Sequence, residues 1–383
     1  MPWKETCPVR ERMGFVMGYE TGLYTTTELS ERYGVSRKTG LKWVKRYQEE
    51  GPEGLGDRSR RPHRSPLRTD EEIEELLVEV RRAHPRWGPK KLLAVVDREH
   101  PELELPARST VAGILKRRGM VRDRPRRRRY RHPGRPLLEV TEPNELWTAD
   151  FKGEFKTLNG RYCYPLTIAD EHSRYLVACD GLASPGLVGA RAVFERAFVE
   201  HGLPEALRTD NGTPFVVPNA LHGLSPLSVW WIQLGIHPYR IEPGKPQQNG
   251  RHERMHRTLK DHTTRPPAAD RRRQQARFDG FRREFNEVRP HEALDQKTPA
   301  DVWRPSPRPY PRRIPQPQYC AHHEKRKVNK IGNISFKGRL VFLSTTLKGQ
   351  TVALEEIDNG IWSIYFYDLM LGRIDERDPK VIP

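Results

Sequence analysis

Three acidic residues stand in settings that could hold a metal ion. Asp150 lies in the strand-like segment LWTADFKG, where alternation places its side chain on the face of Thr148 and opposite Trp147. Asp210 ends the strand-like segment LRTDNG at a turn, and Glu253 lies in the polar helical segment PQQNGRHERMHRTLK. Two strand carboxylates and one helix carboxylate, gathered at one edge of a sheet, would form an oxygen-lined site for two Mg²⁺ or Mn²⁺ ions.

A site of that kind indicates phosphoryl transfer. Two ions can activate an attacking water or 3′-hydroxyl on one side of a phosphodiester and stabilise the leaving oxygen on the other. The protein then contributes mainly positioning and charge. The pattern therefore predicts an enzyme that cuts or joins a nucleic-acid backbone.

Other residues compete for these roles. Asp170 in TIADEHSRY is a further candidate acid, although polar turn residues mostly serve structure. Glu242 is nearer to Asp210 along the chain than Glu253 is, but the Pro-Gly pair after it suits a loop. The segment from His252 to His256 also spells HExxH, a zinc-protease motif. Zincin helices bury an apolar face around that motif, whereas polar and basic residues surround it here: Asn249, Gly250, Arg251, Arg254 and Arg257.

The elements before the acidic segments predict two helical units. Residues 1–62 contain three helix patterns, the last capped by Ser36 and running to about Glu50, in the layout of a helix-turn-helix DNA-binding domain. In that helix Leu41 and Val44 are expected to face inward, and Lys38, Lys42 and Lys45 to share the outer face. An ordinary helical hairpin with a solvated basic face is the alternative.

Residues 66–121 are expected to form a second helix-turn-helix-like domain, with caps at Thr69-Asp70 and Ser109. The segment Gly51–Pro66 is predicted to be a linker. Residues 122–142 form an Arg-rich linker, which we expect to lie along phosphates or in a minor groove through Arg126, Arg127, Arg128 and Arg129.

The elements after Pro143 change in character. Residues 143–304 alternate strand and helix patterns, which predicts a mixed α/β core with the Phe278, Phe281 and Phe285 stripe inside it. A proline-rich linker, Pro305–Gln318, precedes residues 319–383, which predict a small C-terminal β-barrel of four to six strands.

The composition of the chain favours a nucleic-acid partner. Lys and Arg number 68 against 50 Asp and Glu in 383 residues, a formal net charge of +18. The four cysteines show no CxxC pair, so their spacing predicts neither a zinc knuckle nor a disulfide framework. No apolar run is long enough to span a bilayer, and a cytoplasmic location is expected.

Three segments together resemble a known family. LWTADFKG, LRTDNGTPF and PQQNGRHERMHRTLK are similar to the motifs of insertion-sequence DDE transposases, in the retroviral-integrase superfamily. The resemblance implies a ribonuclease H-like catalytic core with Asp150, Asp210 and Glu253 as catalytic metal ligands. It also implies that Lys260, seven residues after Glu253 and therefore on the same helical face, contacts the terminal DNA of the element. Arg257, one turn after Glu253, is expected to join it.

The resemblance implies a bacterial, nucleoid-associated transposase. Such an enzyme binds terminal inverted repeats in double-stranded DNA, cleaves the 3′ ends and joins them to target DNA, as an assembly of at least two protomers. Two rivals remain: a nuclease of the same fold that cuts without joining, and a DNA-binding regulator that has lost catalysis.

Overall fold

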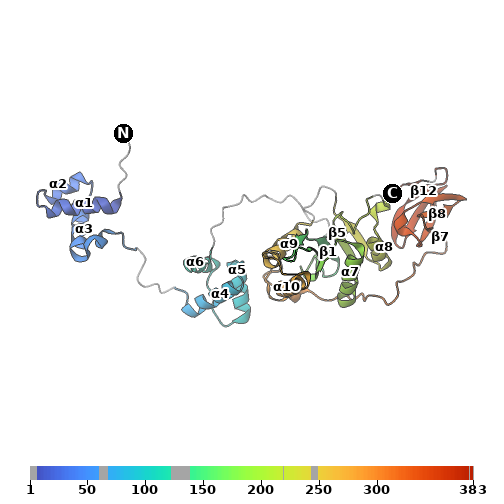
Figure 1. The fold of residues 1–383 in the computed structure, drawn as a ribbon, viewed down its shortest axis with the longest axis horizontal. Helices are drawn as coiled ribbons and strands as arrows, with labels where there is room; N and C mark the ends of the chain where they lie inside the picture. The colour runs from blue at the N-terminus through green and yellow to red at the C-terminus, as the bar shows by residue number, and fades with distance from the viewer. Residues whose placement is uncertain are drawn as a thin grey trace. The chain divides into compact units, whose positions relative to one another are not determined.

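The computed structural model describes residues 7–59, 68–121, 139–218, 220–242, 249–378 and 380–382. The chain divides into two compact units, Met1–Thr69 and Asp70–Pro383 (Figure 1). The four arginines expected to lie along DNA, Arg126 to Arg129, fall outside the described residues. Among the described residues, no helix is long and apolar enough to cross a membrane.

The first unit is a three-helix bundle. Its helices are α1 (Pro8–Glu20), α2 (Thr26–Arg32) and α3 (Arg37–Glu50). The Ser36 side chain accepts a hydrogen bond from the Thr39 backbone and caps α3, as predicted. The bundle surrounds a buried apolar cluster of Phe15, Val16, Leu29, Trp43, Val44 and Leu55.

Two expectations for this unit are wrong. Leu41 is exposed rather than buried, because Trp43 and Val44 supply the inner face of α3. The predicted linker begins later than Gly51, because Gly51–Leu55 forms a 3-10 turn that buries Leu55 in the bundle. Arg12 Nη1 donates a hydrogen bond to the Leu55 carbonyl over 2.7 Å and holds the turn in place.

A second group of three helices opens the larger unit. They are α4 (Glu71–Ala83), α5 (Pro89–Glu99) and α6 (Arg108–Arg117), packed around Leu77, Trp87, Leu92, Val96 and Ile114. Ala107 occupies the N-cap position of α6, so the expected cap at Ser109 is wrong.

The centre of the larger unit is a mixed six-stranded sheet. Its strands are β1 (Leu146–Phe151), β2 (Phe155–Lys156), β3 (Tyr162–Asp170), β4 (Leu176–Leu182), β5 (Ala206–Thr209) and β6 (His237–Arg240). They pair in the order β2-β3-β1-β5-β6, with β4 on β3. Pairing is parallel between β1, β5 and β6 and antiparallel between β1, β3 and β4.

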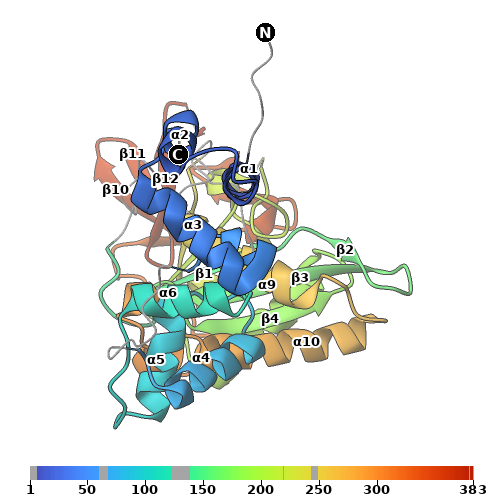
Figure 2. The same cartoon turned by 90° about the vertical axis from the view of Figure 1, so that its left-hand side faces the viewer.

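Helices cover both faces of this sheet. They are α7 (Leu187–His201), α8 (Pro226–Gln233), α9 (Gly250–Thr263), α10 (Arg271–Arg283) and the short α11 (Pro299–Val302). Leu166 and Ile168 of β3 join a cluster with α7 and α8, whereas Cys163 and Ala169 join one with α9 and α10. Figure 2 shows α10 along β4. The three predicted phenylalanines are buried, Phe278 and Phe281 on α10 and Phe285 in the helical turn that follows it.

The C-terminal domain is an antiparallel β-structure. Its strands are β7 (Glu324–Lys327), β8 (Asn333–Phe336), β9 (Arg339–Phe342), β10 (Thr351–Asp358), β11 (Ile361–Phe366), β12 (Leu369–Asp375) and β13 (Val381–Ile382). Five form a sheet in the order β13-β12-β11-β10-β7, and β8 and β9 form a separate hairpin.

Strands β10 and β11 form a hairpin at Asn359-Gly360, since Asp358 of β10 pairs with Ile361 of β11. The expected strand number is wrong, because seven strands replace four to six. Within the part of the chain that the structure describes, no strand pairing closes the sheet into a barrel.

Candidate active site

The register between β1 and β5 places two of the predicted acids side by side. Trp147 pairs with Leu207 and Ala149 with Thr209 on these parallel strands. Asp150 is the next residue of β1, and Asp210 directly follows the last residue of β5. The two aspartates therefore lie at the same edge of the sheet.

Asp150 lies in a crowded, largely buried position. Burial, followed by the negative charge of Asp210 and then that of Glu253, raises the pKa of Asp150 to about 7. Burial also raises the pKa of Asp210, against the hydrogen bond that the Gly212 backbone donates to its carboxylate over 3.1 Å. Asn249 Nδ2 donates a hydrogen bond to Asp150 Oδ2 over 3.2 Å. The three acids thus form one electrostatic cluster, called the acidic edge below.

Helix α9 carries Glu253 on its outer face. Glu253, Arg257 and Lys260 are exposed, whereas Met255 and Leu259 are buried against the sheet. Burial lowers the pKa of Lys152, and the positive charge of Lys260 lowers it further. Lys152 lies two residues after Asp150. This face therefore adds positive charge beside the acidic edge.

The two histidines of the HExxH motif point into the sheet. His252 Nδ1 lies 2.9 Å from Thr148 Oγ1, and its Nε2 lies 2.7 Å from Thr167 Oγ1. His256 Nε2 lies 2.6 Å from the same Thr167 oxygen. Burial, with a smaller effect of Arg208, lowers the pKa of His252 to about 3, and burial lowers that of His256 well below its usual value. Both rings are buried and engaged with threonine hydroxyls, so the motif does not present its histidines as a zinc-protease site does.

The donor set of the acidic edge fits Mg²⁺ or Mn²⁺. Its three carboxylates supply hard oxygen ligands, and the clustering of their charges at Asp150 is what a cation would relieve. Among the described residues, the ligand atoms of the three acids do not all lie within 4.8 Å of one another.

Family comparisons cover most of the described chain. The integrase core domain family matches residues 140–246, and a second integrase core domain family matches 234–299. A helix-turn-helix domain matches 11–63, a homeodomain-like domain 39–115, and the C-terminal domain of IS481 family transposases 323–381.

The chain carries an integrase catalytic core and the C-terminal domain of IS481 family transposases, and it is similar to proteins of insertion elements. It is 29% identical over 247 residues to an uncharacterized 39.2 kDa protein of insertion element IS476 from Xanthomonas euvesicatoria, covering 61% of this chain and 65% of that protein. It is also 29% identical to an uncharacterized 31.7 kDa protein of insertion element IS407 from Burkholderia multivorans, covering 62% and 82%.

The transposase thus spans just under two thirds of the length of the IS476 relative. Among solved structures, the HTLV-2 integrase catalytic core domain in complex with magnesium aligns with 44% of the transposase and 99% of that chain, at 16% identity and a TM-score of 0.34.

Glu171 is a residue of the transposase site that the sequence analysis missed. Its buried carboxylate accepts hydrogen bonds from Arg208 over 3.0 Å and from Arg251 over 2.7 Å. Arg208 precedes Asp210 by two residues, and Arg251 precedes Glu253 by two. Glu171 therefore ties strand β5 to helix α9 next to the acids that each carries. The signal was the acidic pair in TIADEHSRY, of which only Asp170 was considered.

Asp170 has a structural role, in line with the expectation for a turn residue. Its carboxylate accepts hydrogen bonds from the Asn144 backbone over 2.8 Å and from the Ser173 backbone over 2.7 Å. These bonds fix the turn between β3 and β4.

The predicted recognition lysines of the transposase lie in the first unit. Lys38, Lys42 and Lys45 are all exposed on α3. Lys45 Nζ lies 3.7 Å from a Glu49 carboxylate oxygen, and Lys42 Nζ lies 4.8 Å from the centre of the Trp43 ring. Their shared exposed face agrees with the sequence prediction.

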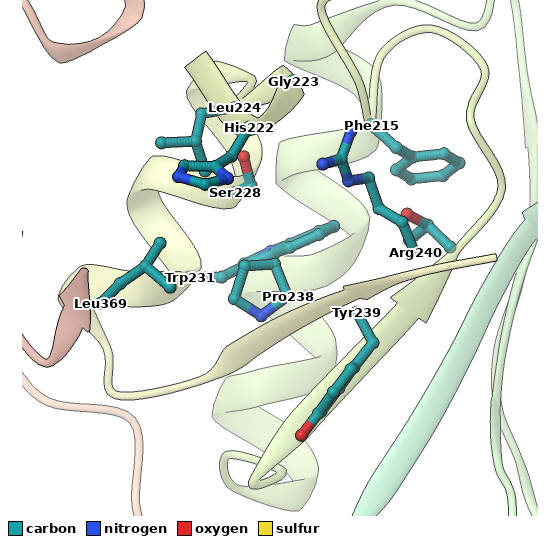
Figure 3. Close-up of a pocket in the computed structure, with 11 residues that line it drawn as sticks. Phe215, His222, Gly223, Leu224, Ser228, Trp231, Pro238, Tyr239, Arg240 and Leu369 are labelled. Carbon is teal, nitrogen blue, oxygen red and sulfur yellow. The ribbon is translucent and has the colours of Figure 1, made fainter. Parts of the chain in front are cut away.

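A cavity of about 160 Å³ lies beside the acidic edge rather than at it. Figure 3 shows the lining of this cavity, with Leu369 of the C-terminal domain on one side, Arg240 on the other, and His222, Ser228 and Trp231 between them. Thr209 lines the cavity, but none of the three acids does. The cavity is therefore separate from the carboxylates.

Proposed function

We propose that this transposase binds the terminal inverted repeats of a mobile element, cleaves its 3′ ends and transfers them to target DNA. The observation that carries the proposal is the convergence of Asp150, Asp210 and Glu253 at one edge of an integrase-core sheet. Residues of this type, on rigid strands and a helix, are suited to aim metal-bound oxygens at a phosphodiester.

In this proposal Asp150, Asp210 and Glu253 hold two Mg²⁺ or Mn²⁺ ions, which supply Lewis-acid chemistry for phosphoryl transfer when bound. Arg257, Lys260 and Lys152 bind backbone phosphates of the element end through their positive charge. His252 and His256 hold the sheet edge through their hydrogen bonds with Thr167, and burial lowers the pKa of both imidazoles.

The other parts of the chain supply recognition. We assign DNA binding to domains 1–62 and 66–121, backbone contacts to Arg126, Arg127, Arg128 and Arg129 in the 122–142 linker, and catalysis to a ribonuclease H-like core at 143–304. We also propose that the domain at 319–383 closes into a small β-barrel. Two element ends require at least two protomers, and the nucleoid of a bacterial cytoplasm is the expected place of action.

A cleavage and strand-transfer assay on duplexes carrying the element's ends tests the function. Glu253→Ala should abolish both steps while end binding, measured by gel shift, stays nearly intact. Glu242→Ala is the matched control and should retain most activity. Loss of activity in Glu242→Ala alone would move the third ligand to that position.

The same assay separates the rivals. Cleavage without joining would identify a nuclease. Binding without cleavage in Mg²⁺ or Mn²⁺ would identify a regulator.

A further inference from the structure

A second group of metal-type ligands lies in the C-terminal domain. Cys320, His322 and His323 have ligand atoms that all lie within 4.8 Å of one another. They occupy the short segment between the proline-rich stretch and β7. None of them belongs to the integrase core, so the acidic edge does not account for this group.

Glu355 of β10 lies next to the two histidines of this group and is a candidate fourth donor. His322 Nε2 lies 3.2 Å from Glu355 Oε1, and His323 Nε2 lies 3.6 Å from Glu355 Oε2. Tetrahedral zinc with bonds of about 2.0–2.1 Å to nitrogen and oxygen places neighbouring ligand atoms about 3.3 Å apart. The His322–Glu355 distance therefore corresponds to one edge of such a tetrahedron.

The surroundings of His323 hold its ring in place beside Glu355. Its side chain is 14% exposed and packs against Tyr319 and Tyr365, with ring centres 6.3 and 5.8 Å away. Its Nε2 is the nitrogen that faces Glu355, so this nitrogen is the one available to a metal ion there.

The ligand chemistry selects the metal. A thiolate with two imidazoles and one carboxylate is a soft to borderline set, which prefers Zn²⁺ over the Mg²⁺ or Mn²⁺ expected at the acidic edge. Four protein ligands leave no open coordination position, which is typical of a structural site.

We propose that Cys320, His322, His323 and Glu355 form a structural zinc site. The site cross-links the segment that follows the proline-rich stretch to strand β10. Tyr319 already anchors that segment, because its hydroxyl donates a hydrogen bond to the Thr351 carbonyl over 2.9 Å and accepts one from the Tyr367 backbone over 3.1 Å. Zinc adds a second anchor directly beside the first.

Metal analysis of the full chain, prepared without a histidine tag, tests the site. After equilibration with Zn²⁺ and gel filtration, the wild-type protein should retain one zinc ion per chain by mass spectrometry. Cys320→Ser and His323→Ala should lose it. Cys7→Ser, at an exposed cysteine in the first unit, and His256→Ala, in the HExxH motif, should both retain it.

Cobalt substitution gives an independent measurement. The Co²⁺ form should show a thiolate-to-metal charge-transfer band that is absent in Cys320→Ser. Cys320 is exposed, so this serine variant should fold normally by circular dichroism. Wild-type protein without bound zinc, zinc kept in both Cys320→Ser and His323→Ala, or zinc lost in His256→Ala would each overturn the proposal.

Discussion

The acidic edge of the core and the Cys320 cluster of the C-terminal domain collect metal-type ligands in opposite ways. The acidic edge combines Asp150, Asp210 and Glu253, which lie far apart in the chain. The register of β1 and β5 places the two aspartates side by side, and helix α9 carries Glu253. The Cys320 cluster takes three ligands from four consecutive positions and adds Glu355 from a strand. The first arrangement depends on a rigid sheet, and the second on one local turn.

The two clusters also differ in charge. Burial and the neighbouring negative charges raise the pKa of Asp150 to about 7, so without a cation the acidic edge is electrostatically unfavourable once ionised. The Cys320 cluster has one carboxylate beside two imidazoles. Desolvation raises the pKa of that carboxylate, Glu355, but its interactions with His322 and His323 outweigh this and lower the pKa. We therefore expect catalytic Mg²⁺ or Mn²⁺ at the acidic edge and structural zinc at the Cys320 cluster.

Metal exchange should give the largest effect. Removing divalent cations should abolish cleavage of element ends, and Mg²⁺ or Mn²⁺ should restore it because the acidic edge offers only oxygen ligands. End cleavage would be measured on labelled duplexes after chelation and return of each ion. If Zn²⁺ restored end cleavage and Mg²⁺ did not, the two clusters would not differ in the metal that they prefer.

Breaking the Glu171 link should give the next largest effect. Glu171→Gln leaves Arg208 buried without a charged partner, so we expect stability to fall by about 3 kcal/mol in urea unfolding. Cleavage should fall more than end binding, because β5 and α9 carry the acids.

Arg251→Gln is the matched control for this link. Its side chain is 46% exposed, so its loss should lower stability by less than Glu171→Gln does. Equal losses in the two variants would mean that the buried pair does not hold the acidic edge together.

Recognition of element ends should depend on neither metal cluster. Replacing Lys38, Lys42 and Lys45 with Ala should lower the affinity for element ends about tenfold or more, because phosphate contacts are lost. Each lost contact should also reduce the slope of log affinity against log salt concentration by about 0.9. Fluorescence anisotropy across a salt series measures both quantities. An unchanged slope would place recognition outside α3.

The smallest effect concerns the stability of the metal-free protein. The pKa of Asp150 is raised from 3.8 to about 7, so the folded state holds an extra proton between these values and loses stability as pH rises through this window. Asp150→Asn removes this loss. In chelator at pH 8 it should melt several degrees above wild type, with a smaller difference near pH 4. Added Mg²⁺ should stabilise wild type alone, and a difference independent of pH would show that Asp150 is not electrostatically crowded.

Much of the acidic edge could be predicted from the sequence alone. Strand alternation placed Asp150 with Thr148, the turn at Asn211-Gly212 ended the strand at Asp210, and helical spacing grouped Glu253 with Lys260. These patterns are local, and backbone periodicity by itself determines which side chains share a face. The same reasoning placed Lys38, Lys42 and Lys45 together on α3.

Only the tertiary structure decided which faces meet. Periodicity could not show that Trp43 would leave Leu41 exposed, or that Arg208 and Arg251 would share Glu171. It could not bring Glu355 to His322, because that contact depends on how β10 packs against a segment more than thirty residues earlier. Nor could it show that the described C-terminal strands pair as a five-stranded sheet and a two-stranded hairpin. Which side chains share one face of a helix or strand depends on that element alone. A functional site needs several elements packed together, and this packing depends on side-chain shape and burial across the whole chain.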